Sequence, residues 1–236
     1  MKYELFLNET YLQYGIEKYI IWDTDVAPHG AIFGTTGSGK TYAEKILLAR
    51  ISIKCPSSQF FICDFKGDSD FSFLAGAERF YRYAECKKGL DNFYNCFLNR
   101  QSGKDNNRNF LLLVWDEWAS YILSLDKKVA EEEKKKLAIL LMLGRSFNVH
   151  ALLCMQRLDV AYIQSRDCIN LVMAMGNLSE EGKEMMFHDY KKQMESNRRQ
   201  GTGYLTINGT NFTPFVVPQV RNHELLNEYI QKAVQR

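Results

Sequence analysis

The chain has 236 residues, of which 46% are hydrophobic and 25% are charged, and this predicts one large globular domain with an ample core. The formal net charge of +2 neither requires nor excludes a nucleic-acid partner, which would have to bind a local basic patch. No stretch approaches the roughly 18 consecutive apolar residues of a membrane-spanning helix, so we expect no intrinsic membrane span.

Cysteine usage and the start of the chain predict the compartment. None of the six cysteines forms a CxxC pair or a Cys/His cluster with zinc spacing. Cys63 and Cys154 lie in apolar runs, where cysteine acts as a small hydrophobe. The first fifteen residues lack the apolar segment of a secretory signal peptide. We therefore expect a cytoplasmic protein, recruited to a membrane only by a partner.

The predicted elements alternate between short apolar strands and helices. We expect two N-terminal strands at residues 3–7 and 18–23, joined by a turn. Further strands are expected at residues 29–33, 58–65, 109–118, 150–156 and 169–175, helices at 41–53, 85–100, 130–143 and 223–234, and a hairpin over 203–217 that turns at Asn208-Gly209. This order predicts an α/β fold with a mostly parallel central sheet flanked by helices. Residues 1–25 form a short β lead-in in this interpretation, and residues 26–236 form the main domain.

The stretch GTTGSGKT, residues 34–41, matches the phosphate-binding pattern G-x-x-x-x-G-K-S/T between a predicted strand and a predicted helix. Its backbone N–H groups and the start of the helix suit phosphate oxygens. Lys40 is expected to reach the β- and γ-phosphates of ATP, and the Thr41 hydroxyl to bind Mg²⁺. A glycine turn without chemical function is the disfavoured alternative. The predicted nucleotide-binding residues are Gly34, Thr35, Thr36, Gly37, Ser38, Gly39, Lys40, Thr41 and Tyr42.

Polar side chains lie at the ends of two later predicted strands, 109–118 and 150–156. LLLVWDEW places Asp116, a predicted Mg²⁺ ligand, beside Glu117, which is predicted to polarise the attacking water. An ordinary acidic turn is the alternative, which the upstream phosphate loop disfavours. The Asp-Glu pair favours an ATPase that uses glutamate as its base over a kinase or GTPase. Gln156 ends the following strand, where its amide is placed to contact the γ-phosphate. A strand-end glutamine is usually a surface residue, and only its position after the Asp-Glu strand favours this catalytic role.

Four segments in this order carry a resemblance: GTTGSGKT, CDFKGD, LLLVWDEWAS and LGRSFNVHALLCMQR. Together they resemble the motor domain of the FtsK/SpoIIIE/HerA superfamily of DNA translocases, from about Trp22 to about Tyr204. Residues 14–41 are similar to coupling-protein ATPases of Gram-positive conjugative elements, and QGTGYL resembles the late glycine-rich turn of the family. The resemblance implies that residues 26–236 form a RecA-like, FtsK-type ATPase domain.

The resemblance also implies an assembly and further site residues. It implies a homo-oligomeric ring, usually a hexamer, with ATP at the subunit interfaces and double-stranded DNA in the pore. Arg145 matches the arginine finger that reaches a neighbour's γ-phosphate, and a cap on the preceding helix is the alternative. Asp64 and Lys66 match the second-strand motif, with Asp64 expected near the outer shell of the metal. Where the family pattern has a proline after QR, this chain has Leu158.

Two basic clusters are candidates for contacting DNA phosphates, which would give salt-dependent, sequence-independent binding. Solvated helix faces are an equally weighted alternative. One cluster lies before a turn that contains two glycines, and the other follows the predicted strand that carries Asp116 and Glu117. Their members are Lys183, Lys191, Lys192, Arg198 and Arg199 near Gly201 and Gly203, and Lys127 with Lys128.

The sequence therefore predicts a ring motor that hydrolyses ATP with Mg²⁺, is stimulated by DNA and moves double-stranded DNA in conjugative transfer or in plasmid or chromosome segregation. A viral-type genome-packaging ATPase is one alternative, since the chain shows neither membrane helices nor a winged-helix module. A nucleotide-dependent switch or scaffold in a transfer complex, without translocation, is an alternative of another class. A relaxase or a membrane transfer complex is a candidate partner.

Overall fold

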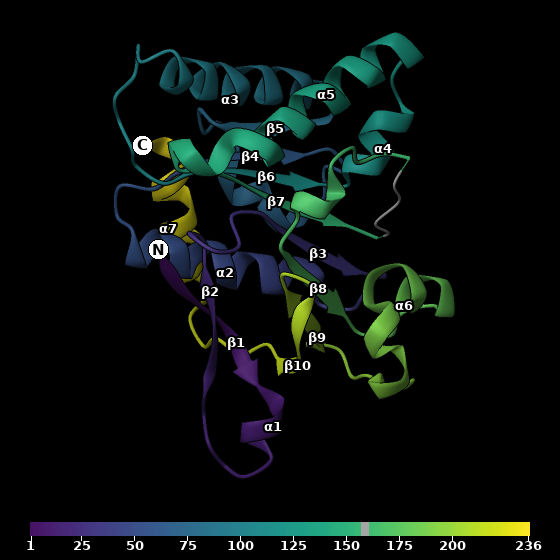
Figure 1. Cartoon of the computed structure of the whole chain (residues 1–236). Helices are drawn as coiled ribbons and strands as arrows, with labels where there is room; N and C mark the ends of the chain where they lie inside the picture. Colours follow the sequence, from purple (N-terminus) through teal and green to yellow (C-terminus); the bar gives the residue numbers. More distant parts are fainter. Residues whose placement is uncertain (157–160) are drawn as a thin grey trace.

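The computed structural model describes residues 1–156 and 161–236. In this part of the chain ten strands form one sheet in the order β2-β1-β10-β9-β8-β3-β7-β6-β4-β5 (Figure 1). The strands are β1 (Lys2–Asn8), β2 (Tyr19–Asp23), β3 (Gly30–Gly34), β4 (Gln59–Asp64), β5 (Phe80–Arg82), β6 (Leu111–Asp116), β7 (Val149–Met155), β8 (Leu171–Met175), β9 (Thr202–Ile207) and β10 (Thr210–Val216). The helices are α1 (Glu9–Leu12), α2 (Lys40–Lys54), α3 (Cys86–Gln101), α4 (Trp118–Leu123), α5 (Lys127–Leu143), α6 (Glu180–Phe187) and α7 (His223–Gln235).

The six strands from β8 to β5 are parallel, and the other four extend the sheet as antiparallel strands. The register places Asp64 beside Asp116, and Asp116 beside Cys154. Because the carboxyl ends of parallel strands meet at one edge of a sheet, the loops after β3, β4 and β6 lie at that edge, and so does Gln156 after β7. The fold thereby gathers the predicted phosphate loop and the predicted acidic pair.

Two apolar layers hold the sheet between helices, which is why its central strands are apolar on both faces. One layer joins α2 and α7 to sheet residues such as Ile32 and Val114. The other joins α3, α4 and α5 to Phe33, Leu113 and Trp115, whose side chains point to the opposite face. Figure 1 shows α3 and α5 on one side of the sheet and α2 and α7 on the other.

The N-terminal lead-in is continuous with the sheet, since β1 pairs with β10 and β2 pairs with β1. The predicted turn between them contains the short helix α1, which Asn8 caps through a hydrogen bond from Thr10 N. The hairpin that carries α1 extends away from the rest of the molecule (Figure 1).

The α/β fold with a mostly parallel sheet is confirmed, together with the hairpin at Asn208-Gly209. One strand prediction is wrong at its end: the strand predicted to reach Trp118 stops at Asp116, and α4 begins at Trp118. The physical reason is Glu117, whose φ of 60° is left-handed and breaks the extended backbone.

No helix in the described ranges is both long enough and apolar enough to cross a lipid bilayer.

Candidate functional site

The predicted phosphate loop joins the buried end of β3 to the first turn of α2 and packs tightly against β8. A Cβ on Gly34 would lie 2.9 Å from the Cβ of Met175, so no larger residue fits there without movement. Gly39 has a φ of 94°, which glycine adopts without strain. The loop can therefore approach a ligand with bare backbone, as phosphate binding requires.

A cavity of about 490 Å³ opens above this loop at the carboxyl edge of the sheet. Every predicted nucleotide-binding residue except Ser38 lines it, and Ser38 is buried beneath. Glu117 and Gln156 line the same cavity, so the structure brings these predicted catalytic groups to the phosphate loop. Further lining residues, which the sequence analysis did not assign to nucleotide binding, are Lys45, Lys66, Asp68, Asp70, Gln200 and His223.

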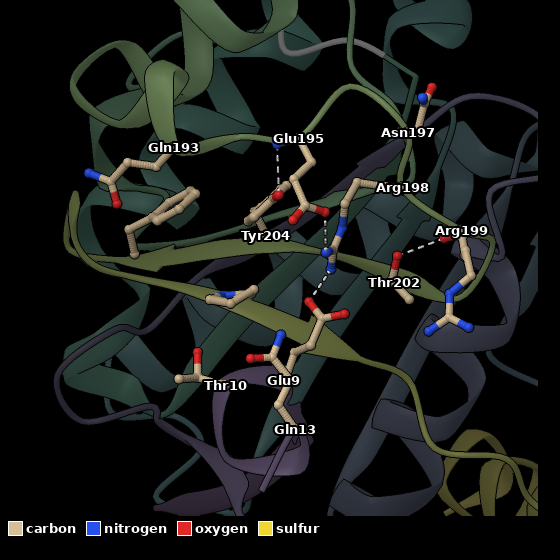
Figure 2. Close-up of a pocket in the computed structure, with 12 residues that line it drawn as sticks. Glu9, Thr10, Gln13, Gln193, Glu195, Asn197, Arg198, Arg199, Thr202 and Tyr204 are labelled. Carbon is tan, nitrogen blue, oxygen red and sulfur yellow. Dashed lines mark hydrogen bonds and ion pairs between the residues drawn. The ribbon is translucent and has the colours of Figure 1, made fainter.

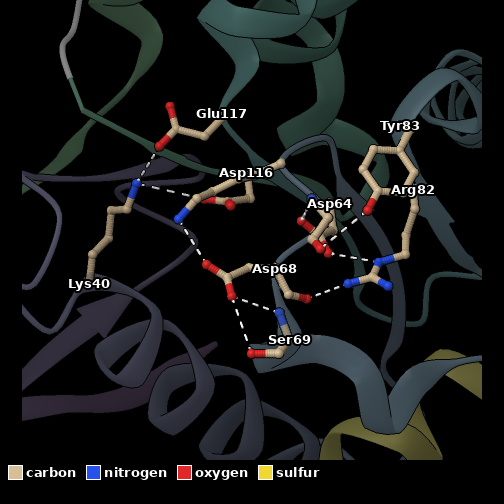
Figure 3. A network of polar contacts seen from close by, with 10 residues as sticks. Lys40, Asp64, Asp68, Ser69, Arg82, Tyr83, Asp116 and Glu117 are labelled. Atoms are coloured by element: carbon tan, nitrogen blue, oxygen red, sulfur yellow. Dashed lines mark hydrogen bonds and ion pairs between the residues drawn. The ribbon is translucent and has the colours of Figure 1, made fainter.

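Lys40 lies between the two predicted catalytic carboxylates (Figure 3). Its Nζ is 2.9 Å from Glu117 Oε1 and 3.7 Å from Asp116 Oδ1, and all three side chains are largely buried. Burial alone would lower the pKa of Lys40, but Asp116 and Glu117 outweigh it and raise that pKa. Burial raises the pKa of Asp116 to about 6, with Lys40 opposing the shift and Glu117 adding to it. The positive charge of Lys40 therefore offsets part of the negative charge on this buried pair of carboxylates.

The left-handed backbone of Glu117 determines where its carboxylate lies. Its N–H donates to Cys154 O at 2.8 Å, which ties the end of β6 to β7. A non-glycine residue in this conformation costs roughly 1–2 kcal/mol, which the surrounding packing has to offset. In exchange, the strained turn directs Glu117 toward Lys40 rather than along the strand. Strain of this kind at a cavity is typical of functional positions.

Asp116 and Thr41 fit the predicted magnesium site. Asp116 Oδ1 is buried and has no hydrogen-bond partner among the described residues, so a cation would satisfy it. Carboxylate and hydroxyl oxygens are ligands that Mg²⁺ accepts. Within those residues no group of three His, Cys, Asp or Glu side chains could hold a metal alone. The donor set therefore suits an ion that completes its coordination with phosphate oxygens and water.

The carboxylate of Asp64 is buried, and it forms hydrogen bonds with the turn that follows β4 and with β5 instead of lining the cavity. Its carboxylate accepts hydrogen bonds from Gly67 N at 2.8 Å and Arg82 Nε at 3.1 Å (Figure 3). Lys66 pairs with Asp68 at 2.8 Å on the cavity wall. The direct contacts make Asp64 the anchor of this turn, and its predicted place in the outer shell of the metal rests only on its position beside Asp116.

Arg145 lies at the opposite edge of the sheet from the cavity. It belongs to the short 3₁₀ turn Gly144–Phe147 that precedes β7, whereas Gln156 follows β7. The seven residues of β7 span roughly 20 Å, so Arg145 does not reach the cavity of its own chain. Its side chain is exposed, and no described residue forms a hydrogen bond or ion pair with it. Arg157 and Leu158 lie outside the described residues.

The basic clusters proposed to contact DNA divide into exposed and internally paired side chains. Arg198 is 6% exposed and forms an ion pair with Glu9 at 2.6 Å, which links the N-terminal hairpin to the segment before β9 (Figure 2). Lys183 is buried and pairs with Glu180 at 2.7 Å, and Lys191 pairs with Glu184. Lys127, Lys128, Lys192 and Arg199 are exposed. Only this last group is free to face a polyanion without breaking a described ion pair.

Some cavity residues carried a weak sequence signal and others none. Lys45 stands four residues after Thr41, which places it on the same face of α2. Gln200 and His223 lie about 160 and 180 residues after the loop, and no local pattern connects them to it.

A family model described as "Helicase HerA, central domain" matches residues 10–201. The "Ftsk domain-containing protein YdcQ" of Bacillus subtilis strain 168 is 26% identical to the chain over 222 residues, which cover 86% of this chain and 45% of YdcQ. The chain therefore spans less than half the length of that relative.

Two solved structures are similar in fold. The cytoplasmic domain of the type VII secretion ATPase EccC from Thermomonospora curvata gives a TM-score of 0.73 at 18% identity, covering 98% of this chain and 31% of EccC. The pCW3 conjugation coupling protein TcpA, in a monomer form with ATPγS, gives a TM-score of 0.68 at 18% identity, covering 91% of this chain and 67% of TcpA. At these identities the likeness concerns the fold.

Proposed function

The chain belongs to the family of the HerA helicase central domain, within the FtsK/HerA group of P-loop ATPases, and we propose that it is a ring-forming motor that hydrolyses ATP to move double-stranded DNA. Its relatives support ATPase activity. The DNA substrate, the ring and the roles of individual residues are our proposal.

One observation carries the proposal: the buried Lys40 of the phosphate loop contacts Glu117 at the cavity wall and forms an ion pair with Asp116 at 3.7 Å. In our proposal, ATP draws Lys40 from Glu117 to its β- and γ-phosphates, because a phosphate offers more negative charge than one carboxylate. Glu117 then becomes free to accept a proton from a water beside the γ-phosphate. Thr41 and Asp116 would hold Mg²⁺, which would neutralise charge on the phosphates. Gln156 lines the same cavity, and in this proposal its amide contacts the γ-phosphate.

The position of Arg145 supports the ring. A cation supplied by a neighbour stabilises the charge that develops during phosphoryl transfer. Since Arg145 lies at the edge opposite its own cavity, it can serve only the cavity of another copy. A head-to-tail arrangement would bring the two together at each subunit interface. Hydrolysis would then depend on assembly.

The family and two of the similar proteins favour DNA as the cargo. The family is described as a helicase domain, YdcQ as an FtsK domain-containing protein and TcpA as a conjugation coupling protein. EccC is described as a secretion ATPase, so a protein cargo is the main competitor. The exposed residues Lys127, Lys128, Lys192 and Arg199 give the chain cationic side chains for phosphates.

The decisive experiment measures ATP turnover with and without duplex DNA at several salt concentrations. We expect duplex DNA to raise turnover severalfold at low salt and less at high salt, because phosphate contacts weaken as salt rises. Lys40→Ala should lose ATP binding. Glu117→Gln should keep ATP binding and lower turnover about 100-fold or more, since the general base is removed. Lys104→Ala, at an exposed loop outside the cavity, is the matched control.

Turnover that is identical with and without duplex DNA at every salt concentration would overturn the translocase assignment. A nucleotide-dependent switch would then be the better description, with slow turnover and a stable monomer in the presence of ATP and DNA. Mass measurement under those conditions separates the two.

A further inference from the structure

The cavity above the phosphate loop is also lined by residues that have no part in the proposed phosphate chemistry. These residues are Gln200 and His223, from the C-terminal part of the chain, and together with Tyr42 at the start of α2 they are called here the C-terminal end of the cavity. No catalytic group proposed above lies at this end. The phosphate loop fixes the direction of a bound nucleotide, so this end has to receive either the nucleoside or solvent.

Tyr42 gives this end a fixed shape. Its hydroxyl donates to Pro218 O at 3.3 Å and accepts from Val220 N at 2.7 Å, so α2 is bonded to the segment that leads to α7. His223, the first residue of α7, is thereby placed beside it, with 5.7 Å between the ring centroids and 47° between the ring planes. The two rings form a tilted aromatic pair next to the phosphate loop, and His223 is exposed to solvent.

Gln200 is held against the phosphate loop itself. Gly201 N donates to Ser38 O at 3.0 Å, and Val217 N donates to Gly201 O at 2.8 Å. A Cβ on Gly39 would lie 3.7 Å from Gln200 Cγ, which shows how closely the glutamine approaches the loop. Its exposed carboxamide is at the cavity wall and offers both a donor and an acceptor.

We propose that Gln200 and His223 form the nucleobase end of this site, where the His223 ring stacks on a purine and the Gln200 amide hydrogen-bonds the edge of that base. The inference rests on the proposed ATP-binding function and assigns residues that the phosphate chemistry does not use. Two features support a base rather than solvent: the flat His223 ring is held against Tyr42, and the Gln200 amide, a donor and an acceptor, lies at the wall of the same cavity. Stacking on an aromatic side chain and an edge hydrogen bond are how proteins commonly bind an unpaired base.

The test compares ATP with inorganic tripolyphosphate, which carries the phosphates but no base. Affinities of both ligands are measured for the full chain, for His223→Ala and for Gln200→Ala. We expect each variant to weaken ATP binding about tenfold, the scale of one base contact, and to leave tripolyphosphate binding within about twofold. His223→Phe, which keeps a flat ring, should restore most of the ATP affinity. The matched controls are His188→Ala and Gln101→Ala, because both of these residues are exposed and lie outside the cavity.

The outcomes separate this inference from the proposed function. If the unmodified chain binds neither ligand, the proposed ATPase fails and the nucleobase site with it. If the chain binds ATP and both alanine variants bind it equally well, the ATPase proposal stands and the nucleobase assignment is overturned. A parallel loss of ATP and tripolyphosphate affinity would also overturn it, because that result would mean damage to the phosphate loop. Thermal unfolding of each variant distinguishes such damage from general misfolding.

Discussion

Glu44 is a fully buried carboxyl group on α2, next to the catalytic charges but outside the cavity. Burial, together with the nearby Asp116, raises its pKa to about 8. The unfolded chain loses this proton near pH 4.5, whereas the folded chain keeps it until about pH 8. The folded state therefore loses stability as the pH rises between these values.

Replacing Glu44 by glutamine removes this penalty. We expect the free energy of unfolding of Glu44→Gln, relative to the unmodified chain, to increase by roughly 3 kcal/mol between pH 5 and pH 8. Urea unfolding at the two pH values measures it. Glu132→Gln, at an exposed position of α5, should show no such increase. An unchanged difference between the two pH values would mean that Glu44 is ionised in the folded chain.

His29 gives stability the opposite dependence on pH. It is fully buried, and its Nδ1 accepts a hydrogen bond from Ala151 N at 3.1 Å. Burial, together with His150, lowers its pKa to about 3. Because the unfolded chain binds a proton near pH 6.5 and the folded chain does not, stability falls as the pH drops below 6.5.

The expected loss from His29 between pH 7 and pH 5 is about 2 kcal/mol of unfolding free energy. His29→Gln should abolish that part of the pH dependence, whatever its effect on stability at neutral pH. His188→Gln, at an exposed residue, should retain it. Urea titrations at pH 7, 6 and 5 provide the comparison, and equal slopes for all three proteins would contradict the prediction.

At the scale of elements, the N-terminal hairpin is fastened to the rest of the molecule by a charged contact as well as by strand pairing. Glu9 of α1 pairs with Arg198 (Figure 2), and Arg198 also donates to Gly203 O at 3.2 Å. Both side chains are largely buried, so removing one charge leaves the other with an incomplete set of partners. The segment that carries Arg198 continues to Gly201, which is bonded to the phosphate loop.

Glu9→Gln should therefore destabilise the protein by about 3 kcal/mol and increase hydrogen exchange in β1 and β2 before it affects the parallel strands. Glu17→Gln, at an exposed position of the same hairpin, should leave exchange unchanged. Exchange measured by mass spectrometry on peptides of the hairpin gives the answer. A Glu9→Gln protein with unaltered exchange would show that strand pairing alone holds the hairpin.

The elements that the sequence predicted are those whose signals are local. The apolar runs of β4, β6 and β7 and the Asn208-Gly209 turn each carry their pattern within a few residues. Three residues of β5 and six of α4 are too few to show a period, and α6 lies in a polar segment. For the site, the phosphate loop and the Asp-Glu pair were visible as a motif and as a strand end. The sequence did not show the Glu9–Arg198 contact or the place of His223 at the cavity, because tertiary packing alone brings these residues together.

At the scale of the whole molecule, the positions of Lys40 and Arg145 predict complementation between two inactive variants. Lys40→Ala lacks a functional phosphate loop, and Arg145→Ala lacks the proposed finger. In a mixed ring, the cavity of an Arg145→Ala subunit beside a Lys40→Ala neighbour has both parts intact. An equal mixture should recover roughly a quarter of the unmodified turnover, since that fraction of interfaces has this composition.

The control is a mixture of Lys40→Ala with Glu117→Gln, whose defects lie in the same cavity and leave no interface intact. ATP turnover after co-refolding or prolonged mixing measures recovery. Failure to recover activity, with mixed assemblies demonstrated by mass, would exclude Arg145 as a group acting between subunits.

The strand β7 has Gln156 after one end and the turn of Arg145 before the other. Each subunit therefore carries the proposed arginine finger at one edge of its sheet and the ATP cavity at the opposite edge. A two-fold axis would bring two fingers or two cavities together and pair none of them, whereas an open head-to-tail row would leave one cavity and one finger unpaired. Only a closed ring supplies every cavity with a finger from its neighbour. An assembly that stays open would therefore have one inactive ATP site, whatever its number of subunits.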